Sequence, residues 1–256
     1  LMLAVLGAGK FLWTLLLVLR VAEIRMDMPL LRRYLVFSGP LMANLFVGNL
    51  ILLFDNWLVG WYYQDTAVFA VFRYGSREFP LAVALATALA TAMIPRLSAS
   101  PEKGMAEMKD KTRRLMHLLF PLTILLLFVS KPLFPLVFNP DFAASAGLFN
   151  IYLLITASRV LLPNAIVLSR GFPAAILRVG IAELLIKIML GFVFIHWFGL
   201  PGVAWSAVLA FFWEKLGLIW FLEKNQGVKT SEWLDIQWYA IYVVLLFTAF
   251  CISMYL

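Results

Sequence analysis

Long apolar runs separated by short polar loops dominate this chain. A helix needs about 20 apolar residues to cross the hydrocarbon core of a bilayer, and exposed backbone cannot remain unpaired there. Eight stretches satisfy this rule, at residues 1–19, 35–62, 67–94, 115–138, 143–168, 174–197, 203–222 and 236–256. The pattern predicts an all-α fold, a polytopic transmembrane bundle of about eight spans.

Two of these stretches carry more specific expectations. Residues 67–94 are predicted to form one long span that could tilt in the bilayer. Residues 115–138 are predicted to break into a helix and an interfacial piece, because Lys131, Pro132 and Pro135 interrupt the apolar run.

The composition supports a membrane environment. The sequence is 63% hydrophobic and 14% charged, whereas soluble domains are roughly half apolar and one quarter charged. A mean hydropathy of +0.92 would leave an apolar surface exposed to water. The single Cys251 excludes an internal disulfide, and His117 and His196 have no second ligand at metal-binding spacing. No cofactor or metal is therefore expected.

Positive charge is distributed unequally between the two sets of alternate loops. One set carries almost all of it: Arg20, Arg25, Arg32, Arg33, Arg96, Lys103, Lys109, Lys111, Arg113, Arg114, Arg170, Lys224 and Lys229. The other set holds only Lys131 and is rich in aromatic residues such as Trp61 and Trp197. Because basic loops stay in the cytoplasm, the first span is predicted to end there and the last to run outward. The net charge of +7 then needs no nucleic-acid partner.

Ionisable residues inside apolar spans are costly and therefore functional candidates. Arg73 and Arg77 are four residues apart, so a continuous helix would place both guanidinium groups on one face. Such a pair suits a pyrophosphate or an acidic sugar, because guanidinium binds oxyanions bidentately. Alternatively, Asp55 lies at a similar depth on the other arm of the hairpin and could neutralise Arg73.

The later spans contain further charges. Glu183 and Lys187 have the acid-first i, i+4 spacing of an intrahelical ion pair, which favours a structural role. Arg159 has no partner nearby in the sequence, so it is expected to face the protein interior or a substrate cavity. Glu214 and Lys215 lie near the inner end of their span, so the sequence does not decide between a structural and a functional role for them.

Several segments together resemble one transporter family, and their order and spacing carry the resemblance. They are Ser38-Gly39-Pro40, Asp55-Asn56-Trp57-Leu58-Val59-Gly60, Phe72-Arg73-Tyr74-Gly75-Ser76-Arg77-Glu78-Phe79-Pro80, Ile94-Pro95-Arg96-Leu97-Ser98, Pro132-Leu133-Phe134-Pro135-Leu136-Val137-Phe138, Asp141-Phe142-Ala143 and Phe198-Gly199-Leu200-Pro201-Gly202-Val203-Ala204-Trp205. The sequence is similar to the polysaccharide flippases of the multidrug/oligosaccharidyl-lipid/polysaccharide exporter (MOP) superfamily.

The resemblance implies a fold of two six-helix lobes around a cavity that opens alternately to either face. Residues 1–33 would be the last helix of the amino lobe and a linker. Residues 34–224 would be the carboxy lobe, and residues 225–256 a linker and an additional helix. The chain is thus expected to be the carboxy-terminal portion of a longer protein. In the related lipid II flippases, cavity arginines are implicated in handling the pyrophosphate, a role that would fall here to Arg73 and Arg77.

The expected function is a non-enzymatic flippase of the bacterial inner membrane. Its substrate would be an undecaprenyl-pyrophosphate-linked oligosaccharide, its other partners membrane lipids and the amino lobe, and its coupling ion is not specified. A cation-coupled multidrug exporter of the same superfamily is the first alternative, and it would need acidic rather than basic cavity residues. A membrane-embedded glycan polymerase is the second, and the absence of a large polar outer loop argues against it.

Overall fold

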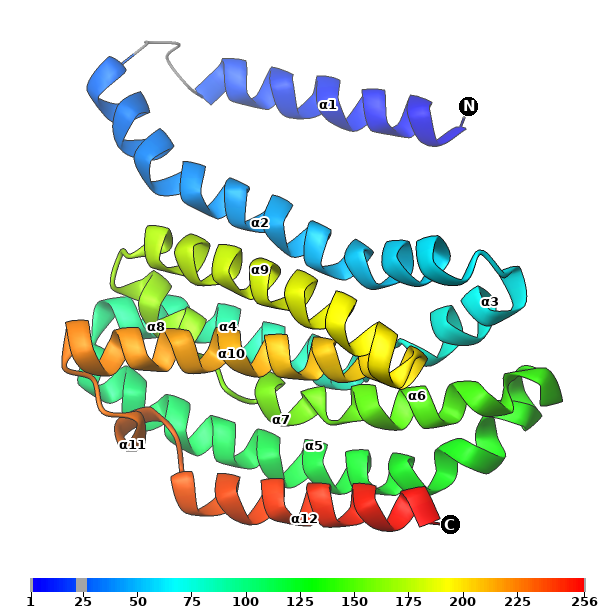
Figure 1. Ribbon diagram of the computed structural model, residues 1–256. Helices are drawn as coiled ribbons and strands as arrows, with labels where there is room; N and C mark the ends of the chain where they lie inside the picture. The colour runs from blue at the N-terminus through cyan, green and yellow to red at the C-terminus, as the bar shows by residue number, and fades with distance from the viewer. Residues whose placement is uncertain (1, 22–26, 256) are drawn as a thin grey trace. The chain divides into compact units, whose positions relative to one another are not determined.

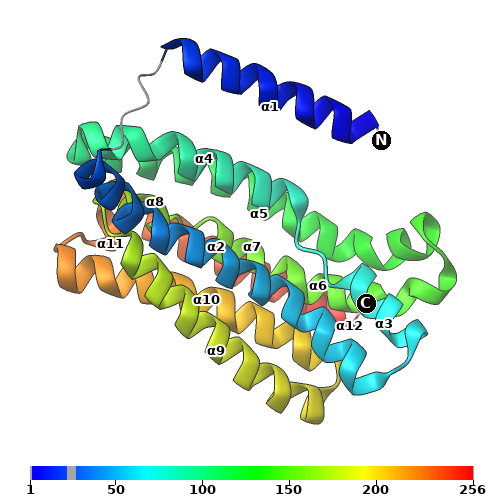
Figure 2. The same cartoon turned by 90° about the horizontal axis from the view of Figure 1, so that it is seen from above.

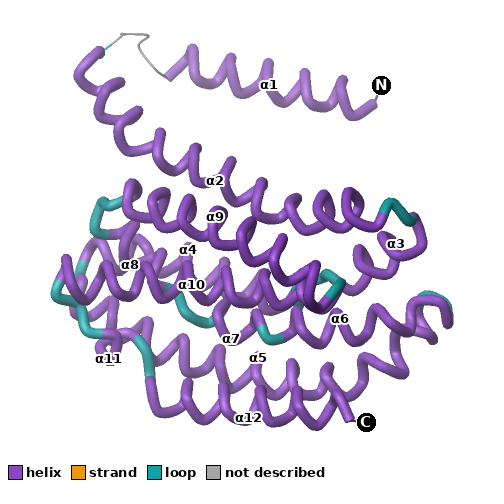
Figure 3. The backbone as a smooth tube through the Cα atoms, viewed as in Figure 1, coloured by secondary structure: helices purple, strands orange, loops and turns teal. Residues whose placement is uncertain are grey.

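The computed structural model describes residues 2–21 and 27–255. Helices account for almost all of this part of the chain, and it contains no strand (Figures 1 and 3). Seven helical segments are long and apolar enough to cross a membrane: Met28–Tyr63, Pro80–Ala99, Pro101–Val137, Pro140–Ser169, Pro173–Phe198, Leu200–Gln226 and Ile236–Tyr255. They overlap seven of the eight predicted spans, so the all-α polytopic bundle is confirmed. The other predicted span, residues 1–19, coincides with α1 (Met2–Val21), which is not among the seven; residue 1 lies outside the described residues.

The chain divides into two compact units, Leu1–Gly39 and Pro40–Leu256. The first unit contains α1 and the start of α2 (Met28–Tyr63). Asp27 caps α2, because its Oδ1 accepts a hydrogen bond from the Leu30 amide at 3.1 Å. The division between the units falls between Gly39 and Pro40, inside α2.

The second unit is a bundle of helices that run roughly along one another (Figures 1 and 2). After α2 its elements are α3 (Thr66–Gly75), α4 (Pro80–Ala99), α5 (Pro101–Val137), the 3₁₀ turn η1 (Pro140–Phe142), α6 (Ala143–Leu153), α7 (Ile155–Arg159), α8 (Pro163–Ser169), α9 (Pro173–Phe198), α10 (Leu200–Gln226), α11 (Thr230–Trp233) and α12 (Ile236–Tyr255). α12 packs along α5, while α4 packs against α5 and α8.

The α9–α10 hairpin is closed by glycines. Gly199 adopts a φ of 63°, in the left-handed region that side chains with a Cβ rarely occupy. A Cβ on Gly202 would lie 2.1 Å from the carbonyl oxygen of Phe194. These glycines therefore let α10 turn back directly onto α9.

The span formed by α6, α7 and α8 is the centre of the bundle. In its most apolar window 83% of the residues are buried, against at most 44% in any other span of the described residues. It is also irregular, since short helices succeed one another at Leu154 and across residues 160–162. A broken helix is tolerated at membrane depth where protein, not lipid, surrounds its backbone.

Two sequence expectations about individual spans are wrong. Residues 67–94 do not form one helix, because α3 ends at Gly75 and α4 begins only at Pro80. Proline lacks the amide that would continue the helix, and it disfavours helical geometry at Phe79, whose ψ is 107°. Conversely, α5 continues to Val137 through Pro132 and Pro135, so the predicted break does not occur. Neighbouring helices can compensate for the backbone hydrogen bonds lost at such prolines.

Large apolar side chains cover much of the outer surface. Leu53, Leu185 and Trp197, for example, are 63%, 62% and 77% exposed. Such a surface would aggregate in water but is normal in contact with lipid acyl chains. The protein is therefore a multi-pass membrane protein.

Candidate functional site

Seven ionisable side chains gather inside the second unit, and we call them the charge cluster. They are Asp55, Glu78, Arg159, Glu183, Lys187, Glu214 and Lys215. Four are carboxylates and three are cations, so full ionisation would leave one negative charge in excess. The way in which these groups pair determines which of them remains available to a ligand.

The first pair joins α2 to α9. Lys187 Nζ lies 2.9 Å from Asp55 Oδ2, and the same oxygen accepts a hydrogen bond from the Tyr152 hydroxyl at 2.9 Å. Lys187 is 1% exposed and Asp55 5%. Gly191, one turn further along α9, permits this approach, because a Cβ there would lie 2.7 Å from the Phe54 ring. Asp55 therefore neutralises Lys187, not Arg73 as the sequence suggested.

The second pair is a bidentate contact between α7 and the segment before α4. Arg159 Nε and Nη2 donate to the two carboxylate oxygens of Glu78, each at 2.7 Å. The guanidinium carbon lies 4.5 Å from the centre of the Phe211 ring, at cation–π distance. No partner for Arg159 could be identified from the sequence, because Glu78 is 81 residues away.

The third group lies on α10 and α8. Lys215 Nζ is 2.7 Å from Glu214 Oε2, and Asn164 Nδ2 donates to Glu214 Oε1 at 2.9 Å. These contacts hold the Glu214 carboxylate at the inner wall of the bundle.

Glu183 is the carboxylate left over. The predicted Glu183–Lys187 pair within α9 is wrong, because Lys187 is engaged by Asp55 across the helix interface. Glu183 is 5% exposed, and its Oε1 is buried without a hydrogen-bond partner in the described residues. Asn164 Oδ1 is buried and unpartnered in the same way. Both oxygens are therefore available to accept a hydrogen bond or to coordinate a cation.

A polar cavity of about 310 Å³ lies beside four members of the charge cluster, Arg159, Glu183, Glu214 and Lys215. It lies between α2, α9 and α10, and its polar walls are Asn44, Asn49, Arg159, Asn164, Glu183, Glu214 and Lys215. The close approach of α2 to α9 at Gly180, where a Cβ would lie 2.5 Å from Asn44 Oδ1, sets one edge. Such a hydrophilic chamber in an otherwise apolar bundle can hold water or the polar part of a ligand. No group of three or more His, Cys, Asp or Glu side chains in the described residues is arranged to hold a metal ion.

Arg73 and Arg77 do not share a helical face, so the predicted geometry of the clamp is wrong. Arg73 lies in the last turn of α3, whereas Arg77 follows the end of that helix. α3 ends where Gly75 packs onto α6, since a Cβ there would lie 2.7 Å from the Ser145 carbonyl oxygen. Both arginines are exposed, and neither forms an ion pair with a carboxylate of the described residues.

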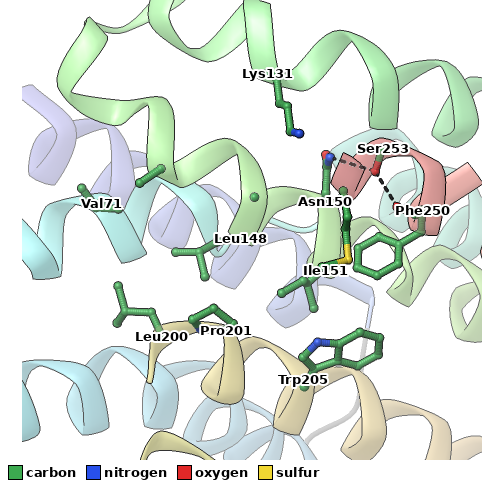
Figure 4. A pocket seen from close by; sticks show the side chains of 13 residues that line it. Val71, Lys131, Leu148, Asn150, Ile151, Leu200, Pro201, Trp205, Phe250 and Ser253 are labelled. Carbon is green, nitrogen blue, oxygen red and sulfur yellow. Dashed lines mark hydrogen bonds between the residues drawn. The ribbon is translucent and has the colours of Figure 1, made fainter. Parts of the chain in front are cut away.

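A second cavity, of about 390 Å³, is mainly apolar (Figure 4). Leu148, Ile151, Trp205 and Phe250 line it, and Lys131 points toward it from α5. Its polar side is already organised, because Asn150 Nδ2 donates to Ser253 Oγ at 3.4 Å and Asn150 Oδ1 accepts from Ser130. It lies beside the first turns of α10, where Leu200, Pro201 and Trp205 line it, whereas Glu214 and Lys215 are near the middle of that helix.

The sequence profile of the polysaccharide biosynthesis protein family matches residues 5–146, more than half of the chain. The chain belongs to this family. The matched region of this polysaccharide biosynthesis protein includes Asp55, Arg73, Arg77 and Glu78, whereas Glu183 and the later charges follow it. Among curated proteins, none matches the chain.

A solved structure confirms the fold. It is that of a MOP superfamily transporter from Pyrococcus furiosus Vc1 (DSM3638), described as having a binding pocket of reverse polarity that suggests a different function. The match has a TM-score of 0.58 and 17% identity, and it covers 85% of this chain and 51% of that one. The chain thus has the MOP fold over about half the length of that transporter. The resemblance is thus confirmed for the polysaccharide biosynthesis protein family and for the MOP fold.

Proposed function

We propose that this chain is one lobe of a flippase that moves an undecaprenyl-pyrophosphate-linked oligosaccharide across the bacterial cytoplasmic membrane. The family, the MOP fold and the multi-pass architecture support membrane transport in polysaccharide synthesis. The chain matches about half of the archaeal transporter, so a second lobe would complete the transport cavity. Alternating access needs no covalent chemistry, and the flippase would act without a catalytic residue.

The observation that carries the choice of substrate is the contrast between paired and unpaired cations. Arg159, Lys187 and Lys215 each face a carboxylate within 2.9 Å. Arg73 and Arg77 are exposed and form no ion pair with any carboxylate in the described residues. An exposed guanidinium without a carboxylate partner is available to an oxyanion, and pyrophosphate presents the oxygens for such a contact.

The geometry also changes how the arginines would act. A rigid two-pronged clamp on one helix is replaced by one arginine on a helix end and one on the connection that follows. Such a connection can shift as α3 and α4 move relative to each other, so Arg77 could engage the substrate in one state and release it in the other.

A cation-coupled exporter of the same superfamily is the second candidate, and Glu183 favours it. This buried carboxylate has an unpartnered oxygen in a polar cavity, next to Glu214. Acidic cavity residues are what an exporter of cationic compounds would use. Arg73 and Arg77 therefore favour an anionic substrate, whereas Glu183 and Glu214 favour a cationic one.

A reconstitution experiment separates the two. The full transporter containing this chain is placed in proteoliposomes with a fluorescent undecaprenyl-pyrophosphate-linked oligosaccharide, and translocation is followed by quenching from the outside. We expect transporter-dependent translocation that excess unlabelled lipid-linked oligosaccharide inhibits. Absence of translocation, together with ion-gradient-dependent uptake of a cationic dye, would refute the flippase proposal and support the exporter.

A further inference from the structure

Arg178 is an ionisable residue in a membrane span that none of the pairs described above involves. It lies on α9 five residues after Pro173, about 7.5 Å along the helix axis from its start. Its side chain is exposed on the outside of the bundle, and its Nε donates only to the Ala174 carbonyl, at 3.3 Å. It forms no ion pair with a carboxylate of residues 27–255. A charge in this position is costly unless an anion or the interface stabilises it.

A groove of about 460 Å³ lies beside Arg178, between α9 and α10. Small residues, among them Ala182 and Gly217, form its floor, and Trp213 and Trp220 form its walls. Gly217 determines its depth, because a Cβ there would lie 3.1 Å from Val179 Cγ1. Trp220 lies six residues before the end of α10, about 9 Å along the helix axis. Arg178 and Trp220 are therefore at similar distances from the end of the hairpin formed by the start of α9 and the end of α10.

The charges around this groove are positive. No Asp or Glu lines it, and Lys224 Nζ lies 4.9 Å from the centre of the Trp220 ring. The predicted orientation places the start of α9 and the end of α10 on the cytoplasmic side. The cytoplasmic leaflet contains anionic lipids, which basic residues near the surface attract. Tryptophan is enriched at the same depth, where an apolar ring and a polar N–H are both accommodated.

From this arrangement we infer an anionic phospholipid site. Arg178 binds the lipid phosphate bidentately, Lys224 adds a second positive charge, and one acyl chain lies in the groove over Ala182 and Gly217 between the two tryptophans. The groove and the guanidinium thus recognise the two ends of one amphiphile. The inference concerns the lipid environment of α9 and α10 and does not depend on the transported substrate.

Lipid selectivity measured on the purified full protein tests this site. The protein is incubated in detergent with equal amounts of phosphatidylglycerol and phosphatidylcholine, and retained lipids are counted by native mass spectrometry. We expect preferential retention of phosphatidylglycerol, lowered about fivefold by Arg178→Gln, which corresponds to the attraction of one basic residue for an anionic surface. Ala182→Trp, which fills the groove without changing charge, should lower retention of both lipids.

The matched control is Lys103→Gln, which removes the same charge from an exposed position in the first turn of α5 and should leave retention unchanged. Normal elution and abundance of each variant exclude misfolding. Equal retention of the two lipids by the unaltered protein, or equal losses in Arg178→Gln and Lys103→Gln, would overturn the site. So would a dimer cross-linked through a cysteine at position 182 in membranes, in a Cys251→Ser background, since a second copy would then cover the groove.

Discussion

Lys187 on α9 and Asp55 on α2 form a buried ion pair, with 2.9 Å between Nζ and Oδ2. Desolvation of two charges offsets much of their attraction, so the pair itself adds little stability. Loss of one partner is different, because it leaves an uncompensated charge inside the bundle.

The first prediction follows from this asymmetry. Asp55→Asn should destabilise the protein by about 3–5 kcal/mol, because it leaves Lys187 charged and unpaired while keeping an acceptor for Tyr152. Lys187→Met alone should have a similar cost, and the double variant should recover most of the loss. Thermal unfolding and abundance in the membrane measure the effect. Additive losses in the double variant would show that the two side chains do not interact.

The second prediction concerns Arg159 and Glu78, which are both partly exposed, and of which Arg159 lines the polar cavity. Arg159→Gln should lower stability by roughly 2 kcal/mol, because Glu78 loses two charged hydrogen bonds. Arg159→Lys should recover only part of this, since lysine cannot make the bidentate contact. If Arg159 serves only Glu78, the double variant Glu78→Gln, Arg159→Gln should regain both abundance and transport. Normal abundance without transport would instead assign Arg159 a contact with the substrate.

The apolar runs were sufficient to predict the helical bundle, because the bilayer thickness sets the length of each span and a helix satisfies all of its backbone hydrogen bonds within the span. The apolar runs could not predict which buried charges form ion pairs. Asp55–Lys187 and Glu78–Arg159 join residues far apart in the sequence, whereas the sequence suggested only the i+4 neighbour Glu183 for Lys187 and the hairpin neighbour Arg73 for Asp55. Lys187 illustrates the failure, since helix packing at Gly191 brings Asp55 within reach and Glu183 is left over.

Two errors had a signal in the sequence. Pro80 favoured a helix end between Arg73 and Phe79, but the long apolar run was read as one helix. Arg178 was visible as a charge in the apolar stretch 174–197, yet no role was assigned to it. The distinction between Arg178 on the outside and Lys187 on the inside needed the structure, because large apolar residues occur all around α9 and do not mark one face as the buried one.

The third prediction tests orientation by labelling cysteines in a Cys251→Ser background. Thr66 and Lys103 are suitable positions, because both are exposed and lie at opposite ends of the α3–α4 span. An impermeant thiol reagent added outside intact cells should label a cysteine at Thr66 and not one at Lys103. Gly104 is a poor position, since it is buried and a Cβ there would lie 2.9 Å from the Leu97 backbone. Labelling of the cysteine at Lys103 alone would show that the orientation is the reverse of the predicted one.

The fourth prediction separates Arg77 from Arg73 in substrate transport. If the exposed arginines hold pyrophosphate, Arg77→Ala should abolish translocation while abundance stays normal, because no carboxylate of the described residues depends on it. Arg77→Lys should retain partial activity, since it keeps the charge but loses the planar contact. The structure also changes the expectation for Arg73. Asp55 is satisfied by Lys187, so Arg73→Ala should not lower abundance, and Asp55→Ala should not rescue any defect that it causes.

Two measurements on the same variants complete this test. Translocation of the lipid-linked oligosaccharide in proteoliposomes reports function, and thermal unfolding reports the fold. Arg114→Ala provides a control, because it removes an exposed arginine on the part of α5 that is predicted to be cytoplasmic, and its partner Asp110 also contacts Arg113. Because α3 ends at Gly75, the two arginines act from separate elements, and each single change should weaken substrate binding by an independent factor. Normal translocation by the Arg73→Ala, Arg77→Ala double variant would eliminate both arginines as substrate ligands, and the cavity beside Glu183 would then be the remaining candidate for the transport site.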